Sequence, residues 1–122
     1  IKTLLNLKNI DNISKEILIK NFYNEYKSNV VLTSGDESKG ICEDYFLDEK
    51  LKVRSVKSKK IKTKNSHGSG CTFSTALCIN LANNKNLYES VVSAKKFTEK
   101  SLVLAPKLGL KYGPVGHQSF FK

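Results

Sequence analysis

The chain has 122 residues, of which 39% are hydrophobic and 26% charged, and this composition is typical of a single globular domain. Its apolar runs are far shorter than the roughly 20 residues that a membrane-spanning helix needs, so the sequence predicts no such helix. The formal net charge of +10 raises the question of nucleic-acid binding. However, Arg54 is the only arginine among 21 basic residues, and base readout favours arginine. We therefore interpret the lysines as a solvated surface and keep a basic nucleic-acid-binding module as an alternative.

The cysteines and histidines follow no pattern typical of a metal site or a disulfide framework. No two of the three cysteines are spaced as C-x-x-C, and the two histidines lie far apart in the sequence. Free thiols are typical of a reducing compartment, and no signal peptide opens the chain as given, so we expect a cytoplasmic protein that binds no metal through these residues. The chain has no methionine, even at its first position, which suggests that the original N-terminus is missing.

In chain order, the first predicted element is an amphipathic helix over residues 14–26, with Ser14 as its N-cap. Its apolar face is predicted to comprise Ile17, Leu18, Phe22 and Tyr26. Residues 29–33 are apolar and β-branched, and we expect a strand buried on both faces that ends at residues 34–36.

A β-hairpin is predicted next, with strands over residues 41–47 and 51–56 and a turn at residues 48–50. Cys42 would pack within the first strand, and Leu51 would lie on one face of the second. A further short strand is predicted over residues 60–64, within the densest basic run of the chain.

The last third of the chain is predicted to be helical. A close-packed helix over residues 71–81, with Cys78 in the core, is followed by a turn and a second helix over residues 87–102. Four buried positions are expected in the second helix: Leu87, Val91, Ala94 and Leu102. The tail after it is rich in glycine and is predicted to be a loop, and His117 is interpreted as a tail residue without a chemical role.

The stretch that indicates chemistry is Thr-Lys-Asn-Ser-His-Gly-Ser-Gly-Cys-Thr-Phe-Ser, residues 63–74, where a glycine-rich turn opens directly into a helix. The first N–H groups of a helix have no intrahelical partner and lie at the positive end of its dipole, so this arrangement favours an anion such as phosphate. Gly68 and Gly70 would allow the backbone to approach that anion closely. A thiol at this position, Cys71, is favoured as thiolate and could serve as base or nucleophile. A plain tight turn, with His67 only shaping the loop, remains the alternative.

This stretch resembles the signature of the hydroxymethylpyrimidine/phosphomethylpyrimidine kinases of thiamine biosynthesis, in the ribokinase-like superfamily. The superfamily generally has Gly-x-Gly-Asp here, and cysteine in place of the aspartate marks the pyrimidine kinases and some pyridoxal kinases. The resemblance extends over nearly the whole chain in element order. It implies an α/β fold, in which residues 1–122 form the C-terminal, nucleotide-side part of a three-layer α/β/α sandwich whose N-terminal half is absent.

The resemblance also implies a function, which is phosphoryl transfer from ATP, with Mg²⁺, to hydroxymethylpyrimidine and then to its monophosphate. Cys71 would be the catalytic residue beside the acceptor hydroxyl, and the backbone N–H groups of Gly68, Ser69, Gly70 and Cys71 would form the anion hole. The family usually continues its preceding strand into Lys-Gly-Gly-His, whereas this chain has Thr33 and Ser34 at the first two of those positions, so a positive charge is absent.

The expected partner is a small-molecule substrate, with no nucleic acid and no membrane, and a homodimer is left open. A pyridoxal or pyridoxine kinase with the same turn is the alternative within the superfamily. We expect the 122-residue fragment alone to be inactive as a kinase, because half of a site cannot align donor and acceptor.

Overall fold

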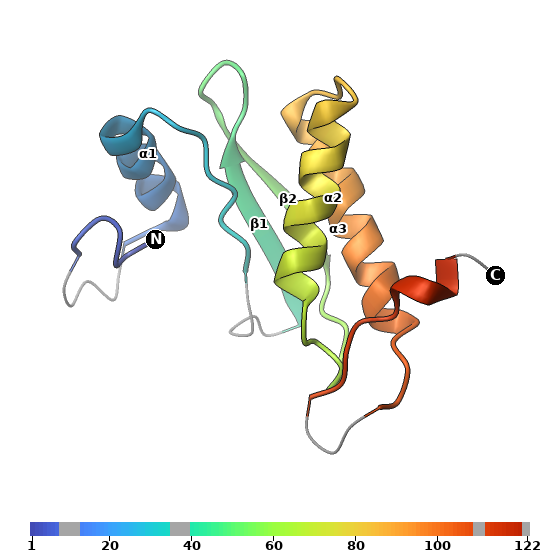
Figure 1. Cartoon of the computed structure of the whole chain (residues 1–122). Helices are drawn as coiled ribbons and strands as arrows, with labels where there is room; N and C mark the ends of the chain where they lie inside the picture. The colour runs from blue at the N-terminus through green and yellow to red at the C-terminus, as the bar shows by residue number, and fades with distance from the viewer. Residues whose placement is uncertain (8–12, 35–39, 109–111, 121–122) are drawn as a thin grey trace. The chain divides into compact units, whose positions relative to one another are not determined.

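The computed structural model describes residues 1–7, 13–34, 40–108 and 112–120 (Figure 1). These residues form two compact units, Ile1–Lys60 and Ile61–Lys122, which we consider separately. The first unit contains helix α1 (Lys15–Tyr26) and strands β1 (Ile41–Leu47) and β2 (Val53–Lys59). The second contains helices α2 (Ser69–Ala82) and α3 (Leu87–Val103) and the short 3-10 helix η2 (His117–Phe120). Mixed helix and strand confirm the predicted α/β class.

Helix α1 begins as predicted, because the Ser14 hydroxyl accepts a hydrogen bond from the Ile17 N–H at 3.3 Å. Its predicted apolar face is wrong in part. Leu18 and Ile19 are buried, whereas Ile17 and Tyr26 are exposed. The helix packs mainly on β1, so only a narrow stripe of its surface loses contact with water.

Strands β1 and β2 pair in antiparallel register, from Ile41 opposite Lys59 to Leu47 opposite Val53. Phe46 and Leu47 are buried and anchor the small core of this unit. On the other edge of β1, Tyr45 exchanges both backbone hydrogen bonds with Leu32, at 2.8 and 3.0 Å. The strand predicted over residues 29–33 is therefore wrong, because this segment is only half-buried and forms a single bridge. Of its predicted end, Gly35 and Asp36 lie outside the described residues.

The hairpin turn is confirmed, but the strand after it is displaced from the prediction. Leu51 has a positive φ of 57° and belongs to the turn, so β2 starts at Val53 and extends to Lys59. The further strand predicted over residues 60–64 is not formed. Cys42 is half-buried within β1, as predicted.

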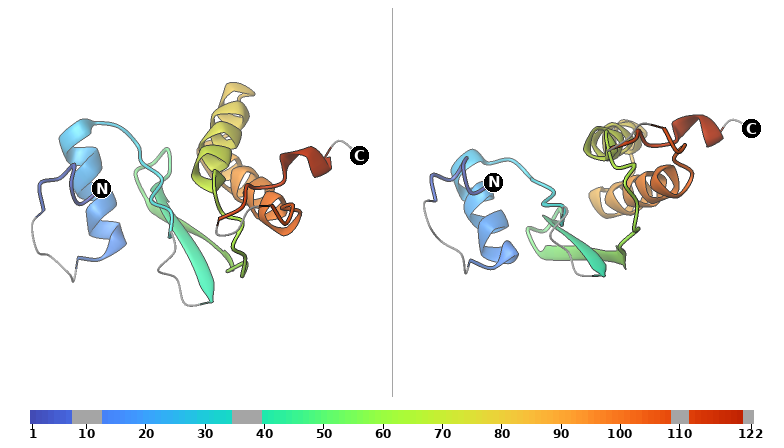
Figure 2. Two further views of the ribbon diagram at one scale, coloured as in Figure 1. Left: turned by 60° about the horizontal axis from the view of Figure 1, so that its bottom comes forward. Right: turned by 90° about the horizontal axis from the view of Figure 1, so that it is seen from below.

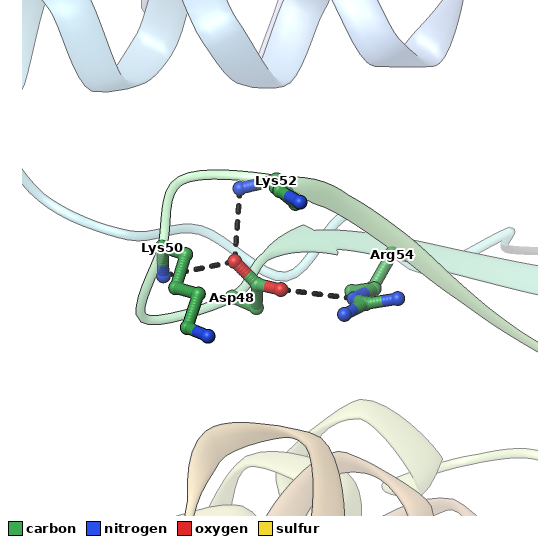
Figure 3. Close-up of polar contacts among 4 residues, drawn as sticks. All are labelled: Asp48, Lys50, Lys52 and Arg54. Atoms are coloured by element: carbon green, nitrogen blue, oxygen red, sulfur yellow. Dashed lines mark hydrogen bonds and ion pairs between the residues drawn. The ribbon is translucent and has the colours of Figure 1, made fainter.

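Asp48 holds the hairpin turn together through three contacts (Figure 3). One carboxylate oxygen accepts the backbone N–H groups of Lys50 and Lys52, each at 2.9 Å, and the other lies 2.9 Å from Nε of Arg54. The backbone hydrogen bond from Lys52, and after it the Arg54 guanidinium and the Lys50 N–H, hold the pKa of Asp48 below its usual value, although burial of the carboxyl opposes the shift. The turn therefore depends on an ionised carboxylate.

In the second unit, α2 and α3 lie side by side (Figures 1 and 2). Asn86 caps α3 by accepting a hydrogen bond from the Glu89 N–H at 2.8 Å. Val91 and Ala94 are buried as predicted, whereas Leu87 and Leu102 are half-buried. The tail is not purely a loop, since residues 117–120 form η2; Gly109 lies outside the described residues.

Asp48→Asn should destabilise the protein at pH 7, because the amide cannot form the ion pair with Arg54. The folded-state pKa of Asp48 is lowered, so its contribution to stability is present above the unfolded value of about 4 and is lost as the pH falls through the folded value. The variant should lack that part of the acid-induced loss, as measured by urea unfolding at pH 7 and at acid pH. Glu25→Gln, at an exposed carboxylate of α1, is the matched control. Parallel pH profiles for wild type and Asp48→Asn would contradict the assignment.

Candidate active site

The glycine-rich turn enters α2 through a left-handed residue. Gly68 is the N-cap of the helix, with φ 86° and ψ 2°, a conformation that strains residues with a Cβ. Its carbonyl oxygen accepts the backbone N–H of Thr72 at 2.9 Å and the Thr72 hydroxyl at 2.8 Å. The predicted helix is confirmed, and it begins two residues earlier than expected, at Ser69.

The N–H groups at this helix start differ in availability. The Ser69 N–H donates to the Ser66 carbonyl oxygen at 3.1 Å. Among the described residues, the N–H groups of Gly70 and Cys71 find no backbone acceptor, as expected for the first turn of a helix. No side chain caps the helix at Gly68. Of the four N–H groups predicted to form an anion hole, that of Ser69 is therefore engaged within the turn, and those of Gly68, Gly70 and Cys71 have no backbone acceptor among the described residues. We refer to the two within the helix, on Gly70 and Cys71, as the open N–H groups.

Gly70 differs from the other glycines of this unit. A Cβ built on Gly70 would meet no atom within 4 Å, whereas a Cβ at Gly113 or Gly116 would overlap backbone carbonyl oxygens. Gly70 also lacks a positive φ. Neither backbone conformation nor internal packing accounts for glycine at this helical position, where alanine favours the helix by about 1 kcal/mol.

The thiols of α2 are both on the surface. Cys71 is exposed in the first turn of the helix, as its predicted role requires. Cys78 is also exposed, so its assignment to the core is wrong. Helix α2 is apolar around most of its circumference, but within its unit it packs mainly on α3, which leaves Ile79 and Leu81 exposed on the same helix. An all-round apolar sequence does not indicate which side faces the core.

The tail of the chain is joined to the turn by backbone hydrogen bonds. The His67 N–H donates to the Gly113 carbonyl oxygen at 3.2 Å, and the Val115 N–H donates to the His67 carbonyl oxygen at 3.3 Å. These bonds form an isolated parallel bridge between His67 and Pro114. His67 therefore shapes the loop, as predicted, and does so through its backbone.

His117 was expected to have no chemical role, and the structure corrects this. Its Nε2 atom lies 2.7 Å from the Thr72 hydroxyl oxygen, and its ring stacks on Phe97 with centroids 6.2 Å apart. Thr72 itself is 5% exposed. The two hydrogen-bonded residues are 45 positions apart in the sequence, so no local pattern could have joined them.

A cavity of about 730 Å³ begins at the turn and continues along α2 and α3. Its size is within the range of small-molecule sites. The lining residues include the turn, both helices and the tail: His67, Gly68, Cys71, Thr72, Thr75, Ala76, Ile79, Asn80, Ser93, Phe97, Pro114, Val115 and His117. Gly68 and Cys71 thus line a cavity that is apolar over much of its surface, whereas Gly70 is not among its lining residues.

Within the part of the chain that the structure describes, no three histidine, cysteine, aspartate or glutamate residues cluster closely enough to hold a metal ion. No helix among the same residues is long and apolar enough to cross a membrane.

Comparison with solved structures identifies the fold. Over 98% of this chain and 45% of the other, the structure matches Staphylococcus aureus pyridoxal kinase, solved in complex with AMP-PCP and pyridoxal, with a TM-score of 0.85 at 24% sequence identity. This likeness confirms the predicted ribokinase-like α/β fold.

The sequence then identifies the family. The phosphomethylpyrimidine kinase family model matches residues 1–116, and the chain belongs to this family. It is 39% identical over 103 residues to a hydroxymethylpyrimidine/phosphomethylpyrimidine kinase of Staphylococcus aureus, covering 83% of this chain and 37% of that protein. It is 38% identical over 89 residues to the thiamine biosynthesis bifunctional protein ThiED of Geobacter sulfurreducens, covering 73% of this chain and 18% of that protein. The chain thus spans well under half the length of these relatives.

Two glycine substitutions should have opposite effects on stability. Gly70→Ala should raise the free energy of unfolding by about 0.5–1 kcal/mol, because alanine favours the helix and meets no neighbour. Gly68→Ala should lower it by about 1 kcal/mol, because its φ is positive. Urea unfolding of both variants measures the difference. A destabilised Gly70→Ala would mean that glycine is required there for the fold.

Cys71 should react with a thiol reagent faster than Cys78 at neutral pH. Both thiols are exposed, so accessibility does not separate them, and only Cys71 lies beside the open N–H groups of a helix start. Labelling rates followed by mass spectrometry, with Cys71→Ser and Cys78→Ser to assign the sites, test this. Equal rates would show that the helix start does not activate the thiol.

Proposed function

We propose that this chain forms the nucleotide-side part of an ATP-dependent kinase that phosphorylates hydroxymethylpyrimidine and then its monophosphate in thiamine biosynthesis. Membership of the phosphomethylpyrimidine kinase family supports the class of reaction. The observation that carries the proposal to particular residues is the turn at residues 68–71, which has two open N–H groups and an exposed thiol, and whose Gly68 and Cys71 line the cavity.

The turn is suited to the transferring phosphate. The N–H groups of Gly70 and Cys71 would donate to phosphate oxygens, and the α2 dipole adds about half a positive charge at the same place. Glycine at position 70 would let the anion approach the backbone closely. This approach would explain why the residue is glycine, which internal packing does not. Phosphoryl transfer depends mainly on such positioning and electrostatic stabilisation.

The cavity would hold the rest of the nucleotide. With phosphates at the turn, the ribose and base of ATP would extend along the cavity between α2, α3 and the tail. Phe97 and Val115 offer apolar surface to a base, and Asn80 and Ser93 are polar groups on the same lining. Structural relatives have been solved with AMP-PCP, which supports a nucleotide with this fold.

Cys71 would act on the acceptor. As thiolate it would take the proton of the acceptor hydroxyl while that oxygen forms a bond to the γ-phosphorus, and the bond from phosphorus to the β,γ-bridging oxygen would break to release ADP. We include Mg²⁺ in the proposal, entering with the phosphates of ATP. No cluster of potential metal ligands is present among the described residues, and we assign no step to the ion.

The proposal also covers the rest of the kinase domain, the compartment and the partners of the enzyme. The chain covers 37% of the length of its Staphylococcus aureus relative, so we propose that the groups which recognise the pyrimidine belong to a larger kinase domain. We also propose a cytoplasmic enzyme with small-molecule substrates and no nucleic acid.

ADP binding to the 122-residue chain tests the location of the phosphates. ADP should shift the amide resonances of Gly70 and Cys71 more than those of α3, and sulfate should compete with it. Gly70→Ala should weaken ADP affinity at least about tenfold, because a Cβ would interfere with charge-assisted hydrogen bonds worth about 1.5–3 kcal/mol. AMP, which lacks the second phosphate, is the control ligand. Shifts confined to other residues would place the phosphates elsewhere.

Cys71→Ala tests catalysis in the complete kinase domain. It should lower kcat by roughly 10²- to 10⁴-fold and leave the KM for ATP nearly unchanged, since a positioned base acts on rate while the backbone holds the nucleotide. Cys78→Ala, seven residues further along the same helix, is the matched control and should keep full activity. Full kcat in Cys71→Ala would show that the thiol is not the base.

The acceptor and the alternative functions need separate assays. ADP release should follow addition of hydroxymethylpyrimidine faster than addition of pyridoxal; the reverse order would indicate a pyridoxal kinase. Nucleic-acid binding that falls steeply with salt would support the basic binding module instead.

A further inference from the structure

We propose that residues 113–117 form a tail clamp that holds the turn at residues 68–71 in its anion-binding shape, and that His117 is its positioning residue. The proposal rests on the proposed function, because the clamped turn is the one assigned there to phosphate. It concerns a residue that comes 45 positions after Thr72, the residue next to the turn, and contacts Thr72 only in the folded chain.

The clamp holds the turn at both ends. Before the turn, the backbone of His67 is bonded on both sides, to Gly113 at 3.2 Å and to Val115 at 3.3 Å. After the turn, the side chain of His117 contacts Thr72 at 2.7 Å. The residues between these two contacts are the turn itself, so the tail spans it on one side while the open N–H groups remain free.

The path of the tail is itself fixed by α3. The Gly116 N–H donates to the carbonyl oxygen of Ser101 at 2.8 Å, and Ser101 is fully buried. A Cβ on Gly116 would overlap the carbonyl oxygen of Leu104, so only glycine lets the tail run this close to the end of α3. The stack of His117 on Phe97 adds a second contact with the same helix. The clamp therefore transmits the position of α3 to the start of α2.

The number of donors and acceptors on each group indicates where the protons lie in the contact between Thr72 and His117. The Thr72 hydroxyl has one proton and two neighbours, the Gly68 carbonyl oxygen at 2.8 Å and His117 Nε2 at 2.7 Å. A carbonyl oxygen only accepts, so the hydroxyl must donate to Gly68 for that contact to be a hydrogen bond. Nε2 of His117 must then carry a proton and donate to the hydroxyl oxygen. On this assignment, in which the hydroxyl donates to Gly68, His117 would be protonated at Nε2.

Without the His117 donor, the Thr72 hydroxyl would be held less firmly against the Gly68 carbonyl oxygen. That carbonyl belongs to the left-handed residue that precedes the open N–H groups. A turn that holds its shape for only part of the time binds its ligand more weakly in the same proportion. A neutral hydrogen bond of ordinary strength corresponds to about a fivefold change in the equilibrium constant between the held and the loosened turn, and this factor is the largest change in population that it can cause. His117→Ala should therefore weaken ADP binding by up to about fivefold.

Two substitutions distinguish positioning from packing. The amide nitrogen of His117→Gln lies as many bonds from Cβ as Nε2 does and can donate to Thr72, so this variant should retain nearly wild-type ADP affinity. The amide of His117→Asn is shorter and should behave like His117→Ala. Gln118→Ala, at the exposed neighbouring residue of η2, is the matched control. Equal losses in the Gln, Asn and Ala variants would overturn the assignment of a donor at Nε2.

Two measurements on the chain without nucleotide keep this test separate from the proposed function. The ¹⁵N shifts of the His117 ring should report a proton on Nε2, and amide exchange of Thr72 should quicken in His117→Ala and recover in His117→Gln. If wild type binds no ADP, the proposed function fails, while these measurements still decide whether the clamp exists. A ring protonated only at Nδ1, or unchanged exchange in His117→Ala, would overturn the clamp.

Discussion

The carbonyl oxygen of Gly68 accepts two hydrogen bonds from one residue, the backbone N–H and the hydroxyl of Thr72, at 2.9 and 2.8 Å. This pair fixes the first turn of α2, because it ties the left-handed residue to the residue four positions later. The N–H groups between them, on Gly70 and Cys71, lie in the first turn of the helix and lack an intrahelical acceptor. The open donors and the position of the thiol beside them follow from this one local constraint.

In the second unit, the fold requires glycine at positions 68 and 116 but not at position 70. Gly68 is required by its positive φ, and Gly116 by the nearby carbonyl oxygen of Leu104. Both residues serve the fold. Gly70 is required neither by a positive φ nor by close packing, and alanine there would strengthen the helix. A glycine retained at a cost to stability is expected where something outside the chain must approach the backbone.

The helices, the hairpin and the glycine-rich turn could be predicted because each depends on signals close together in the sequence. Ser14 caps α1 from three residues away, and the apolar periodicity of α3 identifies Val91 and Ala94 as buried. The strand over residues 29–33 failed for the opposite reason. A strand exists only through its partners, and among the described residues this segment pairs with Tyr45 alone.

The errors at Cys78 and His117 have related causes. An apolar helix such as α2 does not specify its buried side, so Cys78 could not be placed from composition. His117 obtains its role from Thr72 and Phe97, which lie on two other elements, and no spacing rule connects them. A role that depends on a tertiary contact is visible only after the chain has folded, whereas the helix start proposed to bind an anion is encoded locally.

The dispersed lysines of the chain would act on an anion over longer distances than the groups of the candidate site. As far as the structure describes the cavity, none of its lining residues is lysine or arginine, although the whole chain carries a net charge of +10. Charges separated by more than about 8–10 Å are largely screened at physiological salt, so the dispersed lysines would help an anionic nucleotide to approach rather than hold it. Once it is bound, the N–H groups of Gly70 and Cys71 and the dipole of α2 would have to orient its phosphate. These groups are fixed by the backbone, so any contact that fixes the backbone there contributes to phosphate recognition without touching the ligand.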